Sequence, residues 1–362
     1  MINGRNSQVF FENRDDKAFS ALLPVLMDQR QRQLKAWALA AQPDLEAAWS
    51  AVAGDASGRR YFRLQQGSES VIAVDSPPAT EKNQLFLQLR RMLEAAELPV
   101  PALFAGDPEQ GFFLLQDFGD RLLLQELQEQ GTQGAYEPAL ALLLQLQAVD
   151  PKDGDVPLYS EAVLREEFSR FYEWFCIAFL ELQPAPEDAA IVERMGEQLI
   201  RSATQQPQVL VHRDYHSRNL LLQADGSLGL IDFQDAVVGP LCYDLVSLLR
   251  DCYIRLPAAE VRAVALAYRA RLLAAGLPAG ADEGVFLRWF DWIGLQRHIK
   301  VLGNFTRLAL RDGKPGYLGD IPLVLAYIAE VLECYPEFAE FSDWFAARLQ
   351  PLVDQQEWGA SA

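Results

Sequence analysis

Apolar residues recur at roughly helical spacing over residues 21–49, with a break at Pro43. This spacing predicts helices there. The next stretch differs, because a turn-rich run over 54–58 leads into two short apolar segments, 61–64 and 71–74, separated by a further turn. Two such segments around a turn are typical of an antiparallel hairpin.

Beyond the hairpin, the pattern predicts a helix over about 82–97, which two prolines end, and another strand over 112–116. After Gly119 the pattern becomes largely helical and stays so through residue 347. One interruption stands out at 209–233, where two apolar segments bracket a polar loop. The sequence therefore predicts a small sheet with one helix, followed by a larger helical region.

Composition narrows the class of protein. The 362 residues suit two structural lobes, and half of them are hydrophobic, yet no apolar run is long enough to span a bilayer. The net charge of −18 disfavours nucleic acid and anionic membranes as partners. Four sparse cysteines and an N-terminus without a secretory signal favour a cytoplasmic protein with reduced thiols. The sequence carries no signal for oligomeric state, and we expect residues 1–17 to form a flexible tail.

The polar loop carries the candidate chemistry. It holds His212, Asp214, His216 and Asn219, and Asp232 follows Asn219 by thirteen residues. Phosphoryl transfer requires a carboxylate for the attacking hydroxyl and oxygen ligands for Mg²⁺. Asp214 fits the first role, and Asn219 with Asp232 fits the second.

Two other interpretations of this loop remain open. Two of the three histidines in the chain, His212 and His216, flank Asp214, so the three side chains could ligate zinc, although no second ligand cluster has zinc-like spacing. Alternatively, the segment is an ordinary polar loop between strands, in which His212 bonds only to backbone.

The motif His212-x-Asp214 with Asn219, followed by Ile231-Asp232-Phe-x-Asp235, resembles the aminoglycoside phosphotransferase-like kinases. The resemblance implies an α+β, bilobal protein kinase-like fold with a small antiparallel-sheet N-lobe over 18–118 and a larger, mainly helical C-lobe over 119–362. It implies ATP and Mg²⁺ as cofactors, Asp214 as the catalytic base, and Asn219 and Asp232 as metal ligands. His212 and Asp244 would give structural support, and Asp235 is a weaker candidate near the metal.

The same resemblance places the nucleotide against the N-lobe. The turn containing Ser57 and Gly58 would cover the phosphates, and the strand ending near Gln116 and Phe118 would form the hinge that meets the adenine. The chain departs from its relatives at Asp75, near the position where they carry a basic residue for the phosphates. Replacement candidates are Arg60, which we expect among the nucleotide contacts, and Arg59, Arg63 and Lys82, while Glu81 could replace the usual helix glutamate.

A stripe on a C-terminal helical segment turns from apolar to basic. Between residues 297 and 314 it carries five cations against one carboxylate: Arg297, Lys300, Arg307, Arg311 and Lys314 against Asp312. Such a stripe could receive an anionic substrate, or it could be a solvated helix face.

The segments 289–303 and 311–317, together with 250–253, are similar to bacterial anomeric sugar kinases that act on N-acetylmuramate and N-acetylglucosamine in peptidoglycan recycling. This resemblance implies phosphorylation of the sugar C1 hydroxyl. It places His216, Arg297, Lys300 and Arg307 at the sugar, where the lactyl carboxylate of N-acetylmuramate would suit the basic stripe. Two alternatives remain: a kinase for a cationic substrate such as an aminoglycoside or choline, and a non-catalytic nucleotide-binding pseudokinase, which Asp75 would favour.

Overall fold

The computed structural model describes residues 16–42, 48–52, 58–131, 134 and 136–358. The chain forms two compact units. One comprises residues up to Asn83 together with Ala102–Asp117, and the other comprises Gln84–Pro101 together with Phe118 onward. The tail expected over 1–17 lies, apart from its last two residues, outside the described residues.

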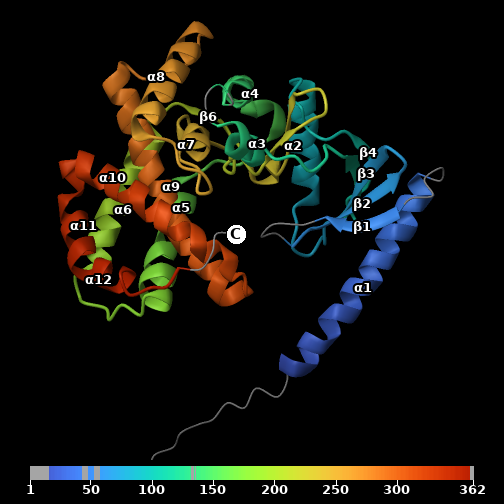
Figure 1. Ribbon diagram of the computed structural model, residues 1–362, viewed down its shortest axis with the longest axis horizontal. Coiled ribbons are helices and arrows are strands. Elements are labelled where there is room, and N and C mark those ends of the chain that lie inside the picture. The colour runs from blue at the N-terminus through green and yellow to red at the C-terminus, as the bar shows by residue number, and fades with distance from the viewer. Residues whose placement is uncertain (1–15, 43–47, 53–57, 132–133, 135, 359–362) are drawn as a thin grey trace, which may run out of the picture. The chain divides into compact units, whose positions relative to one another are not determined.

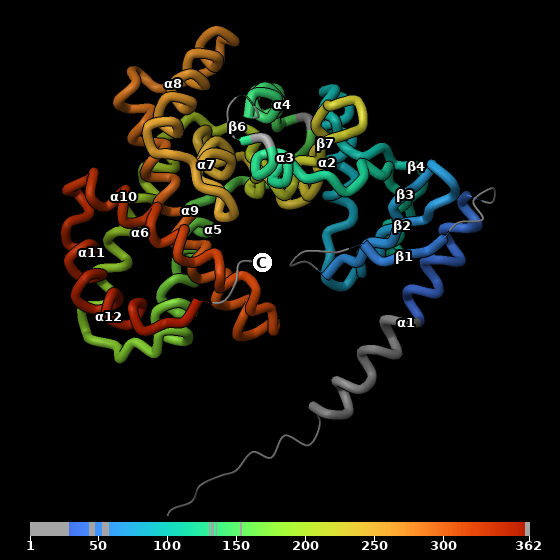
Figure 2. The backbone as a smooth tube through the Cα atoms, viewed as in Figure 1, coloured from blue at the N-terminus to red at the C-terminus, as the bar shows by residue number. Residues whose placement is uncertain are grey.

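The first unit is a helix packed on an antiparallel sheet. Its elements are α1 (Asp16–Ala41), β1 (Ala48–Val52), β2 (Arg60–Gln66), β3 (Glu69–Asp75), β4 (Leu103–Asp107) and β5 (Phe112–Gln116). The strands are hydrogen-bonded side by side in the order β1-β2-β3-β5-β4. Figure 2 labels β1 to β4 of this sheet. Leu34 and Ala38 of α1 are buried against Phe62 and Phe112. The predicted hairpin and the strand over 112–116 are confirmed as β2–β3 and β5.

Two features of this unit differ from the sequence interpretation. Trp49, which we assigned to a helix, lies in β1, where its indole stacks on Phe62 with ring centroids 4.9 Å apart. The edge strand β4 was not predicted. Neither β1 nor β4 has a fully buried residue. Both strands therefore lack the buried positions that give a strand its hydrophobic pattern.

The second unit is mainly helical. Its helices of regular type are α2 (Asn83–Ala95), α3 (Leu123–Gln130), α4 (Glu137–Ala148), α5 (Glu161–Arg170), α6 (Asp188–Gln205), α7 (Tyr243–Leu249), α8 (Ala258–Ala274), α9 (Glu283–Asp312), α10 (Ile321–Cys334), α11 (Ala339–Trp344) and α12 (Gln350–Val353). Two π-helical segments, η2 (Phe171–Phe179) and η6 (Phe345–Leu349), interrupt the regular pattern. The helix predicted over 82–97 is confirmed as α2.

Four short strands among the described residues form two antiparallel pairs in this unit. β6 (Gln208–Val211) pairs with β9 (Val237–Pro240), and β7 (Leu220–Leu222) pairs with β8 (Leu228–Leu230). β6 and β8 are the two apolar segments that bracket the polar loop in the sequence. The loop therefore leaves one strand pair and enters the other.

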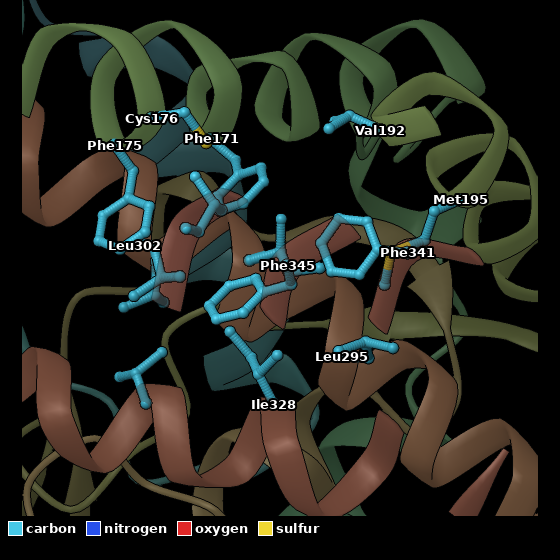
Figure 3. Close-up of a cluster of buried hydrophobic side chains, with 14 of the residues drawn as sticks. Phe171, Phe175, Cys176, Val192, Met195, Leu295, Leu302, Ile328, Phe341 and Phe345 are labelled. Carbon is cyan, nitrogen blue, oxygen red and sulfur yellow. The ribbon is translucent and has the colours of Figure 1, made fainter. Parts of the chain in front are cut away.

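Helix α9 is the central helix of the second unit, in contact with α5, α6, α7, α8 and α10 (Figure 1). It begins where the Asp282 carboxylate accepts the N–H of Val285, 2.8 Å away, and ends at Gly313, whose φ is 66°. These are the residue types that start and stop helices. The side chains of Leu295 and Leu302 from α9 lie in a cluster with Phe171, Phe341 and Ile328 (Figure 3).

Helix α9 and the α5–η2 junction approach each other closely at Gly303. A Cβ atom at Gly303 would lie 2.5 Å from the carbonyl carbon of Arg170 and 2.7 Å from the backbone nitrogen of Phe171. Only glycine permits backbones to approach this closely. The contact fixes the position of α9 against α5.

Candidate active site

The register of the short strands places Asn219 beside Asp232. Leu220, the first residue of β7, pairs with Leu230, the last residue of β8. Asn219 therefore precedes one strand where Ile231 and Asp232 follow the other, and the Ile231 N–H donates to the Asn219 carbonyl at 3.2 Å. Asn219 and Asp232 are thirteen residues apart in the sequence but are neighbours in the structure.

The Asn219 amide joins the three residues predicted to carry the chemistry. Its Nδ2 donates to the backbone carbonyl of Asp214 at 2.9 Å and lies 3.5 Å from Asp232 Oδ2. Gln234 Nε2 donates to the other Asp232 oxygen at 2.6 Å. Because the Asn219 nitrogen is engaged in this way, its Oδ1 is the atom that the side chain can offer to a cation.

Buried carboxylates fix the loop that carries Asp214. The Asp244 carboxylate, in the first turn of α7, accepts the backbone N–H groups of His212 at 2.6 Å and of Arg213 at 3.0 Å. Asp251 Oδ2 accepts the backbone N–H of Ser217 at 3.0 Å. The loop also holds Arg213 at a φ of 76°, a conformation that non-glycine residues adopt at a cost. We infer that these bonds hold the strained backbone in place.

His212 is a buried, neutral side chain. Its Nε2 lies 2.9 Å from the carbonyl oxygen of Ile231, so this nitrogen carries the proton and donates. Burial lowers the pKa of His212 to about 4. The contact joins the start of the loop to the segment that carries Asp232.

A buried ion network underlies the loop, and the sequence interpretation missed its centre, Glu167. The Glu167 carboxylate of α5 bonds to the guanidinium of Arg213 and lies 3.2 Å from Lys300 Nζ of α9. Tyr159 donates its hydroxyl to the same carboxylate. Lys300 also donates to the hydroxyl of Tyr243 at 3.1 Å. Glu167 and Lys300 lie far apart in the sequence, and no sequence pattern indicates that they form a pair.

The local charges set the protonation of the two aspartates. Burial by itself would raise the pKa of Asp214, but the charges of Lys300, His216 and Arg213 outweigh it and hold the pKa below its ordinary value. Burial and the charge of Asp214 raise the pKa of Asp232. A cation between these carboxylates would relieve their repulsion, and the amide and carboxylate oxygens present are the donors that Mg²⁺ prefers. The donor set therefore fits magnesium.

The zinc alternative has no ligand set in the part of the chain that the structure describes. There, no three His, Cys, Asp or Glu side chains gather in a way that could hold a metal ion. His212 instead uses its Nε2 on the carbonyl of Ile231.

The residues predicted to meet the sugar have different surroundings. His216 is buried, lies edge-on to the ring of Tyr253, and has no partner at Nδ1. Arg297 and Lys300 are buried in α9, so the basic stripe is not one solvated face. Arg307 lies about two helical turns beyond Lys300 and is only partly buried. The charged groups that act on it are Arg311, Arg170, Asp312 and Glu166.

Of the residues predicted to meet the nucleotide, Ser57 lies outside the described residues. Arg60 Nη2 lies 2.5 Å from Asp75, which also binds Arg30 of α1. Asp75 stands directly opposite Arg60 in the β2–β3 register. Asp75 therefore ties α1 to the sheet, which gives this acidic residue a structural role.

Two of the three other basic candidates of the first unit, Arg59 and Arg63, also have partners. Arg59 is buried, with its Nε 3.3 Å from Glu81 Oε2, and Arg63 Nε lies 2.5 Å from Asp117.

The remaining residues predicted to meet the nucleotide also have close neighbours in the protein. A Cβ at Gly58 would lie 3.1 Å from Glu81 Oε1. Gln116 Oε1 accepts the backbone N–H of Ala102 at 3.3 Å. In the second unit, a Cβ at Gly229 would lie 2.4 Å from the ring of Phe118.

Comparison with known proteins places the chain in a class. The sequence model of the phosphotransferase enzyme family matches residues 48–281. The chain belongs to this family, and its antiparallel sheet followed by a mainly helical unit confirms the predicted fold class. Its structure is similar to an ADP-bound aminoglycoside phosphotransferase, with a TM-score of 0.55 and 16% identity over 83% of this chain and 98% of the other. A choline kinase from Streptococcus pneumoniae gives a TM-score of 0.54 at 11% identity over the same shares.

Other relatives are more similar to this chain in sequence, and the similarity covers most of its length. An N-acetylmuramate/N-acetylglucosamine kinase from Pseudomonas putida is 40% identical over 329 residues, which cover 88% of this chain and 96% of the relative. A kinase of the same name from Neisseria meningitidis is 37% identical over 91% of this chain and 98% of the relative. Among the described residues, no helix has the length and hydropathy needed to cross a membrane.

Proposed function

We propose that the chain is an ATP-dependent kinase that phosphorylates the anomeric hydroxyl of N-acetylmuramate, N-acetylglucosamine or both, a step in the reuse of peptidoglycan sugars. The names of relatives about 40% identical over most of their length support the choice of sugar. The family supports the reaction class.

One observation carries this proposal: the Asn219 amide contacts both Asp214 and Asp232. Phosphoryl transfer depends mainly on positioning and charge neutralisation, so its groups must converge. Here the Asn219 amide bonds to the backbone carbonyl of Asp214 and lies 3.5 Å from the Asp232 carboxylate, so the three residues adjoin one another. A pseudokinase would not need to keep this set intact.

In the proposed reaction, Asp214 orients the C1 hydroxyl and accepts its proton as the sugar oxygen bonds to the γ-phosphorus. The bond from that phosphorus to the bridging oxygen breaks, and ADP leaves with the electron pair. Asn219 and Asp232 would hold Mg²⁺, which neutralises charge on the phosphates. The charge of Lys300 and the contacts of Asp244 keep Asp214 ionised and in place.

The direct test is a turnover assay with Mg-ATP and separate acceptors: N-acetylmuramate, N-acetylglucosamine, kanamycin and choline. We expect ADP release with an amino sugar and a phosphorus NMR signal coupled to the anomeric proton. Preference for kanamycin or choline would replace the sugar assignment, and a phosphate on another hydroxyl would refute the anomeric one. Failure of every acceptor to cause ADP release would favour a pseudokinase.

The role of Asp214 is tested by Asp214→Asn. A general base contributes about 10²- to 10⁴-fold to the rate, so we expect a loss of that size in kcat with the affinity for Mg-ATP retained. Asp225→Asn makes the same chemical change in the exposed turn between β7 and β8 and serves as the matched control. An Asp214→Asn enzyme as fast as this control would refute the assignment.

A further inference from the structure

Arg297 is a buried cation that forms no ion pair in the part of the chain that the structure describes. Its side chain lies in the middle of α9, and the residue is 4% exposed. The one hydrogen bond that it donates there goes to the Sγ atom of Cys252, 3.6 Å away. A thiol is a weak acceptor, and the carboxylates of Asp251 and Asp214 act on Arg297 without forming an ion pair with it. Most of the N–H donors of this guanidinium are therefore left for a further acceptor.

The other cations of α9 show that this arrangement is specific to Arg297. Lys300, one turn away, is neutralised by Glu167 at 3.2 Å. Arg311 is exposed and bonds to Asp312 at 2.7 Å, and the partly exposed Arg288 bonds to Glu337 at 2.7 Å. Arg307 is partly exposed, so water can solvate its charge. Of the three α9 cations expected at the sugar, Arg297 is the one that is both buried and without a carboxylate.

The surroundings of Arg297 place it beside the catalytic loop. Its contact, Cys252, follows Asp251, whose carboxylate holds the backbone of Ser217 in the loop at 3.0 Å. Although burial opposes the charged form, Cys252, Tyr243, Asp251 and Asp214 raise the pKa of Arg297, so the group stays a cation.

We propose that Arg297 binds a carboxylate of the acceptor sugar and is the residue by which the enzyme distinguishes N-acetylmuramate from N-acetylglucosamine. This inference rests on the proposed function. The two sugars differ only by the lactyl ether on O3, which carries the carboxylate. A guanidinium matches a carboxylate in two-pronged geometry, which an ammonium group does not. Arg297 lies beyond residue 281, outside the segment that the family model matches.

The experiment compares kcat and KM for both sugars in wild type, Arg297→Gln and Arg288→Gln. The last variant makes the same change at an exposed position of the same helix. In Arg297→Gln, we expect kcat/KM for N-acetylmuramate to fall about 10- to 100-fold, the effect of losing a charge-assisted bond, mainly through KM. Turnover of N-acetylglucosamine should stay within about twofold of wild type, and this retained activity shows that the variant is folded.

Two further arms keep the inference testable if Arg297→Gln does not fold. Arg297→Lys keeps the charge but loses the fork, so it should lose part of the N-acetylmuramate activity and keep the N-acetylglucosamine activity. For wild type, the methyl ester of N-acetylmuramate should show the raised KM expected of a neutral ligand. Equal KM values for acid and ester would overturn the proposal.

The outcomes separate this inference from the proposed function. If wild type phosphorylates neither sugar, the proposed function fails. If wild type phosphorylates both and Arg297→Gln affects both equally or neither, the sugar assignment stands and the role of Arg297 is refuted. A raised KM for ATP with both sugars would instead assign Arg297 to a nucleotide phosphate, which also overturns the proposal.

Discussion

Gly303 offers a quantitative test of how α9 is held against α5. In Gly303→Ala, the new Cβ would lie 2.5 Å from the Arg170 carbonyl carbon, whereas ordinary contact begins at 3.4 Å. The helices must therefore separate by about 0.9 Å, because the opposing atoms are backbone atoms that cannot rotate away. Overpacking of this kind costs about 1–3 kcal/mol, and we take the upper end for a backbone contact. Replacing glycine by alanine in a helix recovers about 1 kcal/mol.

The net expectation is a loss of about 2 kcal/mol in the free energy of unfolding. This corresponds to a fall of about 4–8 °C in the melting temperature of a unit of this size, measured by thermal circular dichroism. Because Glu167 and Lys300 lie on the two separated helices, kcat should fall as well. Gly294→Ala is the matched control on α9, since its Cβ would meet the side chain of Val246 at 3.2 Å, which can adjust.

The comparison between the two alanine variants tests whether the close approach at Gly303 constrains α9 and α5. Gly294→Ala should be as stable as wild type or up to about 1 kcal/mol more stable, because it gains helix propensity without a backbone clash. If Gly303→Ala melts at or above the temperature of Gly294→Ala, the close approach at Gly303 does not constrain the helices, and the reasoning is refuted.

Two further predictions concern the groups beneath the loop. Glu167→Gln leaves Arg213 and Lys300 without their buried counter-charge, which should cost about 3–5 kcal/mol by urea unfolding and lower kcat; a loss below about 1 kcal/mol would contradict the network. The pKa of His212 is depressed to about 4, so the unfolded chain binds a proton that the folded chain rejects, and stability is lost as pH falls below about 6.5. At pH 5 the loss in the free energy of unfolding due to His212 is about 2 kcal/mol. This loss should be absent from His212→Gln. Parallel plots of stability against pH for wild type and the variant would refute the prediction.

The candidate site residues could be named from the sequence because their types and spacing suit the proposed reaction. A carboxylate, an amide and a second carboxylate near short apolar strands are what phosphoryl transfer needs. The Asn219 amide does contact the Asp214 backbone and the Asp232 carboxylate, while the catalytic roles of the three residues stay predictions. The β2–β3 hairpin and α2 could likewise be predicted, because each buries one face and therefore shows a regular hydrophobic pattern. The edge strands β1 and β4 were not, because neither carries a fully buried residue.

The charge pairing of the basic stripe could not be read from the sequence. Spacing places Arg297 and Lys300 on one helix but does not show which of them has a buried partner. That depends on Glu167, which lies in a different helix and has no distinguishing pattern around it. The role of Asp75 was hidden for the same reason, since its partner Arg30 precedes the sheet in the chain.

The pairing of β7 with β8 has a consequence for engineering the molecule. The interval between Asn219 and Asp232 is set by the exposed turn over 224–227, whereas their proximity is set by the pairing of Leu220 with Leu230. The turn can therefore be lengthened without separating the two side chains. It is a suitable place for a peptide tag or a fluorophore that reports on the active site while leaving turnover intact.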